Sequence, residues 1–187
     1  MAAKKQSNEG KKEIRIVNIV VSTSLEHDIP LEKMAATLSN TEYNPEQFPG
    51  LVIRIKEPKT SALIFSSGKV VCTGARTMEE VQESIKKIIK SLEKIGIKIK
   101  IEPIIKIQNI VASGSIGMDL NLNTLAMKLD NTEYEPEQFP GLVYKLLDDR
   151  ATFLLFSNGK IVCTGTKTEE DVHRVLDKLI RNLKKVM

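Results

Sequence analysis

The spacing of hydrophobic and polar positions changes several times along the chain, and each period predicts an element. Residues 14–22 alternate as a strand does, whereas residues 31–38 carry apolar side chains at helical spacing. Residues 43–50 contain two prolines and predict a loop. Two more strands meet at Ser67-Gly68, a pair that favours a two-residue hairpin turn. A long helix follows, with a capping box of Thr77 and Glu80 at its start and Gly96 at its end.

The same pattern occurs twice along the chain, as an internal repeat. The block N-T-E-Y-N-P-E-Q-F-P-G-L-V at residues 40–52 recurs as N-T-E-Y-E-P-E-Q-F-P-G-L-V at residues 131–143, an offset of 91. The same offset maps residues 63–74 onto 154–165 without a gap, and about half of the paired positions are identical. Two long copies are too few for a solenoid, so we expect a pseudo-twofold pair. The predicted organisation is a disordered tail (1–12), a first repeat (13–95), a linker (96–104) and a second repeat (105–187).

One face of the predicted sheet has no cover. Two helices per repeat can cover one side only, so the other side should alternate to polar residues. Instead, both alternating sets are apolar or small. If Ile64, Val70 and Cys72 face the helices, the open side carries Leu63, Phe65, Val71 and Thr73, joined by Ile16, Asn18 and Val20. An uncovered apolar face of this extent is typical of a binding surface.

Composition and charge exclude several classes of protein, but they do not identify a binding partner. The 187 residues include 5 Phe, no Trp and 2 Cys, with a net charge of +4. The repeats are close to neutral, because most of the excess lies in the tail and linker, so bulk charge does not indicate nucleic acid. Two cysteines exclude a disulfide scaffold. No apolar run is long enough for a membrane span and no signal peptide precedes the repeats, so we expect a soluble intracellular protein without a membrane partner.

Catalytic signals are weak. His27 and His173 do not recur between the repeats. Cys72 and Cys163 lack C-x-x-C spacing and fall on the helix-facing side, so we expect buried free thiols. Ser67-Gly68-Lys69 lacks the upstream glycine of a phosphate-binding loop. We therefore predict no enzyme, no metal, no cofactor and no small-molecule substrate.

The repeated blocks also carry a resemblance. N-I-V, Y-x-P-E-Q-F-P-G-L-V and L-[IL]-F-S-x-G-K-[VI]-V-C-T-G, each present in both repeats, resemble the core of the TATA-box-binding protein family in its archaeal form. The resemblance implies an α+β fold in which two β-α-β(4)-α repeats form one curved antiparallel sheet, a saddle with helices on its convex side. It also implies a transcription initiation factor that binds the minor groove of A·T-rich promoter DNA. The expected location is cytoplasmic and nucleoid-associated, or nuclear in a eukaryote.

By this resemblance, phenylalanines wedge between base steps and bend the duplex. The expected wedges are Phe48 and Phe65 at one end of the site, and Phe139 and Phe156 at the other. Burying two rings of about 150–250 Å² each returns at most roughly 7–12 kcal/mol, against a few kcal/mol for unstacking a step.

The resemblance also implies base-edge and phosphate contacts. The base-edge set is Asn18, Asn109, Val20, Val111, Val71, Val162, Thr73, Thr164, Leu63 and Leu154. The phosphate set is Arg54, Lys59, Lys69, Lys145, Arg150 and Lys160. In the minor groove an A·T pair offers only acceptors, which Asn and Thr can satisfy, whereas G·C adds an amino group that valines would leave unpaired.

Protein partners are implied for the second repeat. In the family, the second loop docks transcription factor B, which makes Glu135 and Glu137 the candidates, with RNA polymerase recruited indirectly. Gln47 and Gln138 stand where a eukaryotic first repeat has a basic residue before the loop phenylalanine, so a charged contact is in doubt there.

Two other functions stay open on the residues alone. The sheet aromatics of a single-stranded nucleic-acid binder would stack bases, and an apolar face would also suit a protein-docking scaffold. Lys86, Lys87, Lys90 and Lys94 on the long helix either contact a second partner or form a solvated face.

Overall fold

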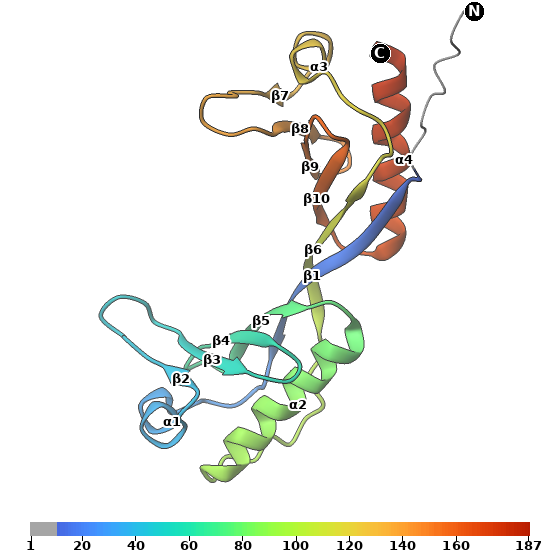
Figure 1. Ribbon diagram of the computed structural model, residues 1–187. Helices are drawn as coiled ribbons and strands as arrows, with labels where there is room; N and C mark the ends of the chain where they lie inside the picture. Colours follow the sequence, from blue (N-terminus) through green and yellow to red (C-terminus); the bar gives the residue numbers. More distant parts are fainter. Residues whose placement is uncertain (1–10) are drawn as a thin grey trace, which may run out of the picture. The chain divides into compact units, whose positions relative to one another are not determined.

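The two repeats fold into the same order of elements, which a computed structural model describes over residues 11–187 (Figure 1). The first repeat contains β1 (Glu13–Ser24), α1 (Leu31–Thr37), β2 (Thr41–Glu42), β3 (Leu51–Ile55), β4 (Thr60–Ile64), β5 (Lys69–Ala75) and α2 (Met78–Lys94). The second contains β6 (Lys106–Ser115), α3 (Leu122–Lys128), β7 (Thr132–Glu133), β8 (Leu142–Leu146), β9 (Ala151–Leu155), β10 (Lys160–Thr166) and α4 (Glu169–Val186). The predicted β-α-β(4)-α order and the α+β class are confirmed. Residues 1–10 of the predicted tail lie outside the described residues.

The strands of the described residues belong to one sheet, in the hydrogen-bonded order β2-β3-β4-β5-β1-β6-β10-β9-β8-β7. The hairpin pairs within each repeat are antiparallel. The chain forms two compact units, and we call residues 17–110 the first unit and residues 11–16 with 111–187 the second. The limits of these units fall inside β1 and β6, so each of these two strands contributes residues to both units.

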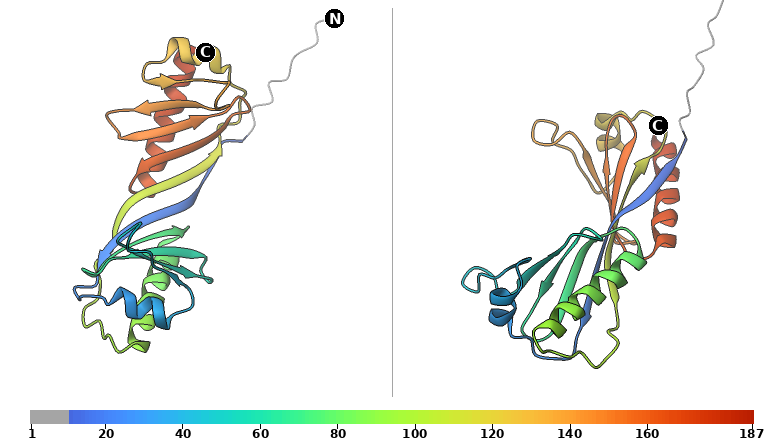
Figure 2. Two further views of the ribbon diagram at one scale, coloured as in Figure 1. Left: turned by 90° about the vertical axis from the view of Figure 1, so that its left-hand side faces the viewer. Right: turned by 60° about the horizontal axis from the view of Figure 1, so that its bottom comes forward.

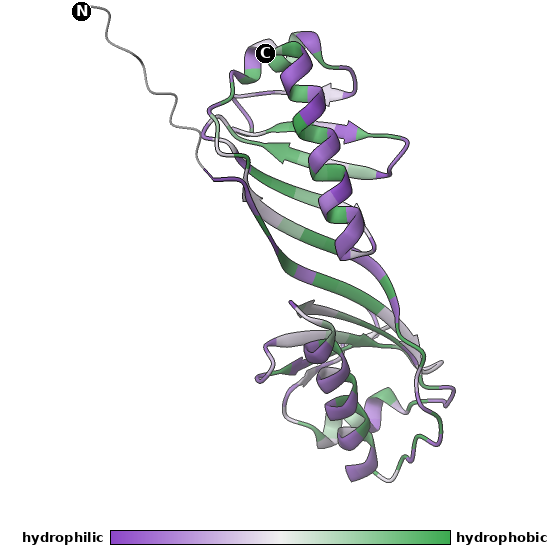
Figure 3. Cartoon of the chain, turned by 90° about the vertical axis from the view of Figure 1, so that its right-hand side faces the viewer, coloured by the Kyte–Doolittle hydropathy of each residue, from purple (hydrophilic) through white to green (hydrophobic). Residues whose placement is uncertain are grey.

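In each unit a long helix covers one face of the strands. Alternate residues of β3, β4 and β5 are fully buried, among them Ile53, Ile64 and Cys72, as expected for side chains beneath a helix. In the left view of Figure 2 the strands face the viewer, and α2 and α4 lie behind them. Figure 3 shows hydrophilic residues on the outer face of α4 and mostly hydrophobic strands beyond it. The opposite face of each unit carries no long helix.

The ends of α2 follow the sequence signals. Thr77 Oγ1 accepts a hydrogen bond from the Glu80 amide at 3.1 Å, and the Glu80 carboxylate accepts one from the Arg76 amide at 2.8 Å. At the other end the Gly96 and Ile97 amides donate to carbonyls of the last turn, which ends the helix as a Schellman motif. No helix within residues 11–187 is long and apolar enough to cross a membrane.

The two units stabilise the contact between sheet and helix differently. In the first unit Thr60 and Ser84 are buried and share a hydrogen bond of 2.8 Å between their hydroxyl oxygens. The matched positions of the second unit are Ala151 and Val175, both fully buried. Phe153, the one phenylalanine without a counterpart, is fully buried there, where the first unit has Ala62. Phe153 therefore belongs to the core and not to the open face.

A charged cluster ties the β8–β9 turn to α4. Asp149 accepts hydrogen bonds from Lys178 at 2.6 Å and from Arg174, and Arg174 also pairs with Asp171 at 3.2 Å. The Asp149 side chain is only 10% exposed. These two cations, Lys178 above all, hold the pKa of the Asp149 carboxyl below its ordinary value. In the first unit the position of Asp149 is taken by Pro58, so this cluster belongs to the second unit.

Asp149→Asn removes the carboxylate that both cations share. Because the pKa of Asp149 is lowered in the folded chain, its stabilisation is complete above the ordinary carboxyl pKa of about 4 and is lost as the pH falls below it. We expect the substitution to lower the unfolding midpoint by roughly 2–4 °C at pH 7, as for a loss of about 1 kcal/mol. The decrease should be smaller at pH 3. Calorimetry at both pH values measures this, with the exposed neighbour Asp148→Asn as the control. An equal decrease at both pH values would contradict it.

Candidate functional site

An apolar stripe crosses three strands on the open face of each unit. In the first unit Val52 lies opposite Leu63, and Leu63 lies opposite Val71. The matched residues of the second unit, Val143, Leu154 and Val162, have the same register. All six are only half-buried, although every strand neighbour on the helix side is buried. The stripe is therefore available for a partner.

Val52 and Val143 belong to this stripe, although the predicted base-edge set does not include them. Each is the second residue of a short strand, directly after the Pro-Gly of the loop. Counting back by two from Arg54 or Lys145 places both valines on the open face. The alternation of the short strand was thus a usable signal.

A pair of phenylalanine rings lies beside each stripe. Phe48 and Phe65 have ring centroids 5.9 Å apart at an interplanar angle of 67°, and Phe139 and Phe156 have centroids 5.9 Å apart at 70°. Edge-to-face packing of this kind is favourable for aromatic rings. Phe48 is 42% exposed and Phe139 is 43% exposed, whereas their partners are half-buried. The loop ring of each pair is thus held by a neighbour and presented to solvent.

Gly50 and Gly141 make room for these ring pairs. A Cβ at Gly50 would lie 2.8 Å from Phe48 Cε1 and 3.1 Å from Phe65 Cε1. At Gly141 the corresponding distances to Phe139 and Phe156 are 2.7 and 3.0 Å. Any side chain at either position would displace at least one ring. The glycine of the repeated F-P-G block is therefore required by the space that the rings occupy.

The hairpin that carries Phe65 differs from its prediction. The Phe65 amide donates to the Lys69 carbonyl, and the Gly68 amide donates to the Phe65 carbonyl, both at 2.9 Å. The loop thus has three residues, with Gly68 at a φ of +92°, and the predicted two-residue turn is wrong. A Cβ on Gly68 would also lie 2.5 Å from the carbonyl oxygen of His27, so glycine is needed here for both reasons.

A hydrogen-bond network orients Asn18 on the open face. The Gly74 amide donates to Asn18 Oδ1 at 2.7 Å, and Asn18 Nδ2 donates to Thr73 Oγ1 at 3.0 Å. Because the Gly74 amide can only donate, it fixes which end of the Asn18 side chain is the oxygen. The amide nitrogen of Asn18 keeps a second hydrogen for a ligand acceptor. Asn18 therefore suits a partner that presents acceptors.

The other predicted base-edge residues lie half-buried on the strands. Val20 lies on β1, at a point where the register to β5 shifts between Ile19 and Val21. Asn109 and Val111 lie on β6, and Thr164 lies on β10. Each unit by itself therefore brings valine, leucine and threonine side chains to its open face.

The predicted phosphate contacts are exposed, and two of them already have partners. Arg54 pairs with Glu42 at 3.0 Å, and Lys145 pairs with Glu133 at 3.5 Å. Arg54 lies in the same cross-strand row as Ser61 and Thr73, next to the apolar stripe. The remaining members of the set are exposed at turns and strand starts: Lys59, Lys69, Arg150 and Lys160.

The acidic loop between β7 and β8 supports the exposed ring of the second unit. The Glu135 carbonyl accepts hydrogen bonds from the Gln138 and Phe139 amides, both at 3.0 Å. The side chains of Glu135 and Glu137 are exposed. A partner that contacts these carboxylates would therefore touch the loop that carries Phe139.

The cysteines are buried beneath the helices, as predicted. Burial raises the pKa of Cys72 to about 11, against a smaller lowering by a hydrogen bond to Ser84, and burial raises the pKa of Cys163 to about 12. Both thiols are therefore protonated at neutral pH and poor nucleophiles. Within residues 11–187 no three His, Cys, Asp or Glu side chains gather in a way that could hold a metal ion.

Comparisons with known proteins point to one family. The family described as "Transcription factor TFIID (or TATA-binding protein, TBP)" matches residues 13–95 and 104–186. The TATA-box-binding protein of Methanocaldococcus jannaschii is 53% identical over 93% of this chain and 95% of its own length. That of Archaeoglobus fulgidus is 49% identical over 91% and 94%. The solved structure "Methanococcus jannaschii TBP" superposes with a TM-score of 0.88 over 93% of this chain and 99% of that one.

Gly50→Ala tests the fit of the first ring pair. We expect the added methyl to displace Phe48 and to lower the unfolding midpoint, because edge-to-face contact worth about 0.5–1.5 kcal/mol is lost. Aromatic proton shifts in nuclear magnetic resonance spectra report the loss of ring contact directly. The double variant Phe48→Ala/Gly50→Ala is the control: the glycine substitution should cost less stability once the Phe48 ring is absent. Equal costs in both backgrounds would show that Gly50 is not needed for the rings.

Proposed function

The chain belongs to the TATA-binding protein family, and from this premise we propose that it binds the minor groove of A·T-rich promoter DNA and bends it to start transcription. The observation that carries the proposal is the uncovered apolar stripe of each unit, with an exposed phenylalanine beside it. The minor groove of A·T pairs suits such a face, because it presents no donor that an apolar face would leave unpaired.

The free energy that each inserted phenylalanine gains by burial is closer to the cost of unstacking a base step than the full areas of the rings imply. Phe48 is 42% exposed, so about 85 Å² of a ring of roughly 200 Å² remains to be buried, which is worth about 2 kcal/mol at 25 cal/mol/Å². Unstacking a base step costs a few kcal/mol. Each wedge thus roughly offsets the kink that it makes. Net affinity has to come from the apolar stripes and the phosphate contacts.

Selection for A·T pairs follows from the chemistry of the open face. Asn18 is oriented to donate, and adenine N3 and thymine O2 accept. Valine and leucine offer no acceptor to the amino group of guanine, which would be buried without a partner at a cost of about 1–3 kcal/mol. Deformable T-A steps favour the same sequences, because they unstack at a lower cost.

Basic side chains at the rim of each stripe complete the proposed interface. Arg54 and Lys145 would exchange their glutamate partners for phosphates, which suits exposed ion pairs of low strength. The exposed Glu135 and Glu137 provide the surface for transcription factor B, which in turn recruits RNA polymerase. These partners are supported by the exposure of the acidic loop and by the family to which the chain belongs.

A gel-shift experiment separates the proposal from its alternative, a single-stranded binder. We expect an A·T-rich duplex to bind at least about 1000-fold more tightly than either of its strands, as specific sites do relative to non-specific ones. A G·C-rich duplex of equal length is the control for phosphate attraction alone. Preference for the single strand would contradict the promoter function. Equal binding of the two duplexes would contradict A·T recognition.

Phe139→Ala tests the wedge. We expect smaller energy transfer between dyes at the two ends of an A·T-rich duplex, because the kink at one end of the site is lost. Affinity should change by less than about tenfold, since about 2 kcal/mol of ring burial and the similar cost of unstacking disappear together. Met127→Ala is a matched control, because Met127 is 80% exposed on α3 and away from the stripe. If the wild-type chain does not bring the dyes closer, bending itself is wrong.

A further inference from the structure

The hairpin between β9 and β10 holds the one Asn-Gly pair of the sequence, Asn158-Gly159. Every other asparagine is followed by a larger side chain or by proline. An Asn-Gly pair is chemically labile, because glycine has no side chain to keep its amide nitrogen away from the side-chain carbonyl of the asparagine. Asn158 is exposed, so water reaches the pair. The pair is therefore a candidate for covalent modification.

The geometry of the turn favours attack by the Gly159 nitrogen on the Asn158 side chain. The Lys160 amide donates to Asn158 Oδ1 at 3.1 Å and closes an Asx turn. In such a turn the side-chain carbon Cγ folds back toward the amide nitrogen of the next residue, so the two reacting atoms start near each other. The same hydrogen bond stabilises the negative charge that develops on Oδ1 during the attack.

One hydrogen bond acts in the opposite direction. The Gly159 amide donates to the Phe156 carbonyl at 3.0 Å, and its proton has to leave before the nitrogen can attack. The reaction therefore requires that this bond opens, which is easier at an exposed hairpin tip than inside a sheet. We expect the modification to be slow in the native chain.

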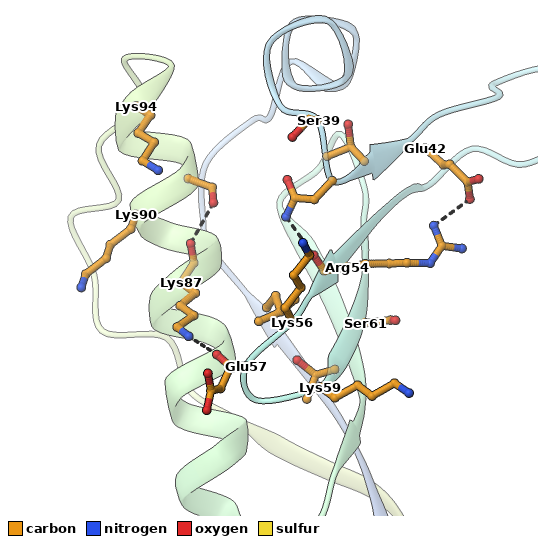
Figure 4. Close-up of a pocket in the computed structure, with 15 residues that line it drawn as sticks. Ser39, Glu42, Arg54, Lys56, Glu57, Lys59, Ser61, Lys87, Lys90 and Lys94 are labelled. Carbon is orange, nitrogen blue, oxygen red and sulfur yellow. Dashed lines mark hydrogen bonds and ion pairs between the residues drawn. The ribbon is translucent and has the colours of Figure 1, made fainter.

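The matched cations at the rims of the two stripes are paired in the same way, but the hairpin tips differ. Arg54 pairs with Glu42 (Figure 4), and its counterpart in the second unit pairs with Glu133. At the hairpin tip the first unit has Ser67 where the second has Asn158. Serine has no side-chain carbonyl and forms no imide. The modification would therefore affect the second unit only.

Asn158 lies at the end of the open face that carries the second ring pair. Together with Phe156, Lys160 and Val162 it lines a hollow of about 610 Å³. Val162 belongs to the apolar stripe, and Lys160 belongs to the predicted phosphate contacts. A negative charge at position 158 would stand two residues from this lysine and would compete with a phosphate for it.

We propose that Asn158 deamidates spontaneously and that the product weakens binding of the second unit to DNA. The Gly159 nitrogen forms a bond to Asn158 Cγ, the bond from Cγ to Nδ2 breaks, and the amide proton leaves with that nitrogen as ammonia. Water then opens the cyclic imide at either of its carbonyls, which gives aspartate or isoaspartate and releases one proton. The effect on DNA rests on the proposed function, whereas the chemical step does not.

The two products differ in what they do to the hairpin. Aspartate keeps the side-chain oxygen that the Lys160 amide binds, so only the charge changes. Isoaspartate adds one carbon to the main chain of a loop that the hydrogen bond from the Phe156 amide to the Lys160 carbonyl closes. The hairpin has little room for this carbon, since a Cβ on Gly159 would already lie 2.2 Å from the Met118 carbonyl oxygen. Isoaspartate therefore also displaces Phe156, which supports Phe139.

Incubation of the full chain at mildly alkaline pH, followed by mass spectrometry of its peptides, tests the chemical step. We expect the peptide with Asn158 to gain the mass of an amide-to-acid conversion before any peptide with another asparagine, and isoaspartate to accompany aspartate. Asn158→Ser, which copies the residue of the first unit, is the control and should gain no negative charge at the hairpin. A chain in which any other asparagine reacts first would overturn the proposal.

Asn158→Asp isolates the effect of the charge on DNA binding. We expect the affinity for the A·T-rich duplex to fall by roughly two- to fivefold. The slope of log affinity against log salt should decrease by about one, because Lys160 no longer neutralises a phosphate. Asn123→Asp adds the same charge at an exposed position of α3, outside the stripe, and should leave both values unchanged.

The two experiments fail independently of each other. Equal affinities of Asn158→Asp and the wild-type chain for the duplex would overturn the effect on DNA. Equal losses for Asn158→Asp and Asn123→Asp would overturn it as well, since they would reflect net charge alone. If the wild-type chain binds no duplex, the promoter function is wrong, while the mass measurement still decides whether Asn158 deamidates.

Discussion

The constraint on which the rest depends is that each unit has one long helix and two faces of sheet. Beneath α2 and α4 alternate strand residues are buried by the helix, among them Ile64 and Leu155, which are both 0% exposed. The stripe residues between them are apolar too, yet they remain partly exposed in the described chain. A sheet with two apolar faces and a helix on one of them is complete only with a partner. The binding function is thus a consequence of a sheet that has two apolar faces but a helix on only one of them.

The ring pairs show how the exposed part of this face is kept in order. An isolated phenylalanine in a loop would sample several rotamers and would lose that freedom on binding. Phe48 instead rests edge-on against Phe65, and the absence of a side chain at Gly50 leaves the space that this arrangement needs. Part of its apolar surface is already buried before any partner arrives. Less apolar surface of Phe48 is therefore left to be buried on binding, but less conformational entropy is lost as well.

Most of the fold could be predicted from the sequence, but less of the candidate site could. The repeat, the order of the elements, the caps at Thr77 and Gly96 and the burial of Cys72 were all predictable, because period and composition decide them locally. The three-residue loop at Gly68 was not, since a Ser-Gly pair suits a two-residue or a three-residue loop, and the hydrogen bonds of Phe65 with Lys69 and Gly68 distinguish the two. The ion pair of Arg54 with Glu42 was also missed, because it joins residues twelve positions apart across two strands. Those features come from tertiary packing, which no local pattern encodes.

The division of β1 and β6 between the two units has a consequence for a chain that contains only one repeat. Residues 13–16 complete the sheet of the second unit, and the Glu13 carbonyl comes so close to Gly114 that a Cβ there would lie 2.0 Å from it. A chain with a single repeat would therefore have an unfinished edge, which only the same strand of another molecule could complete.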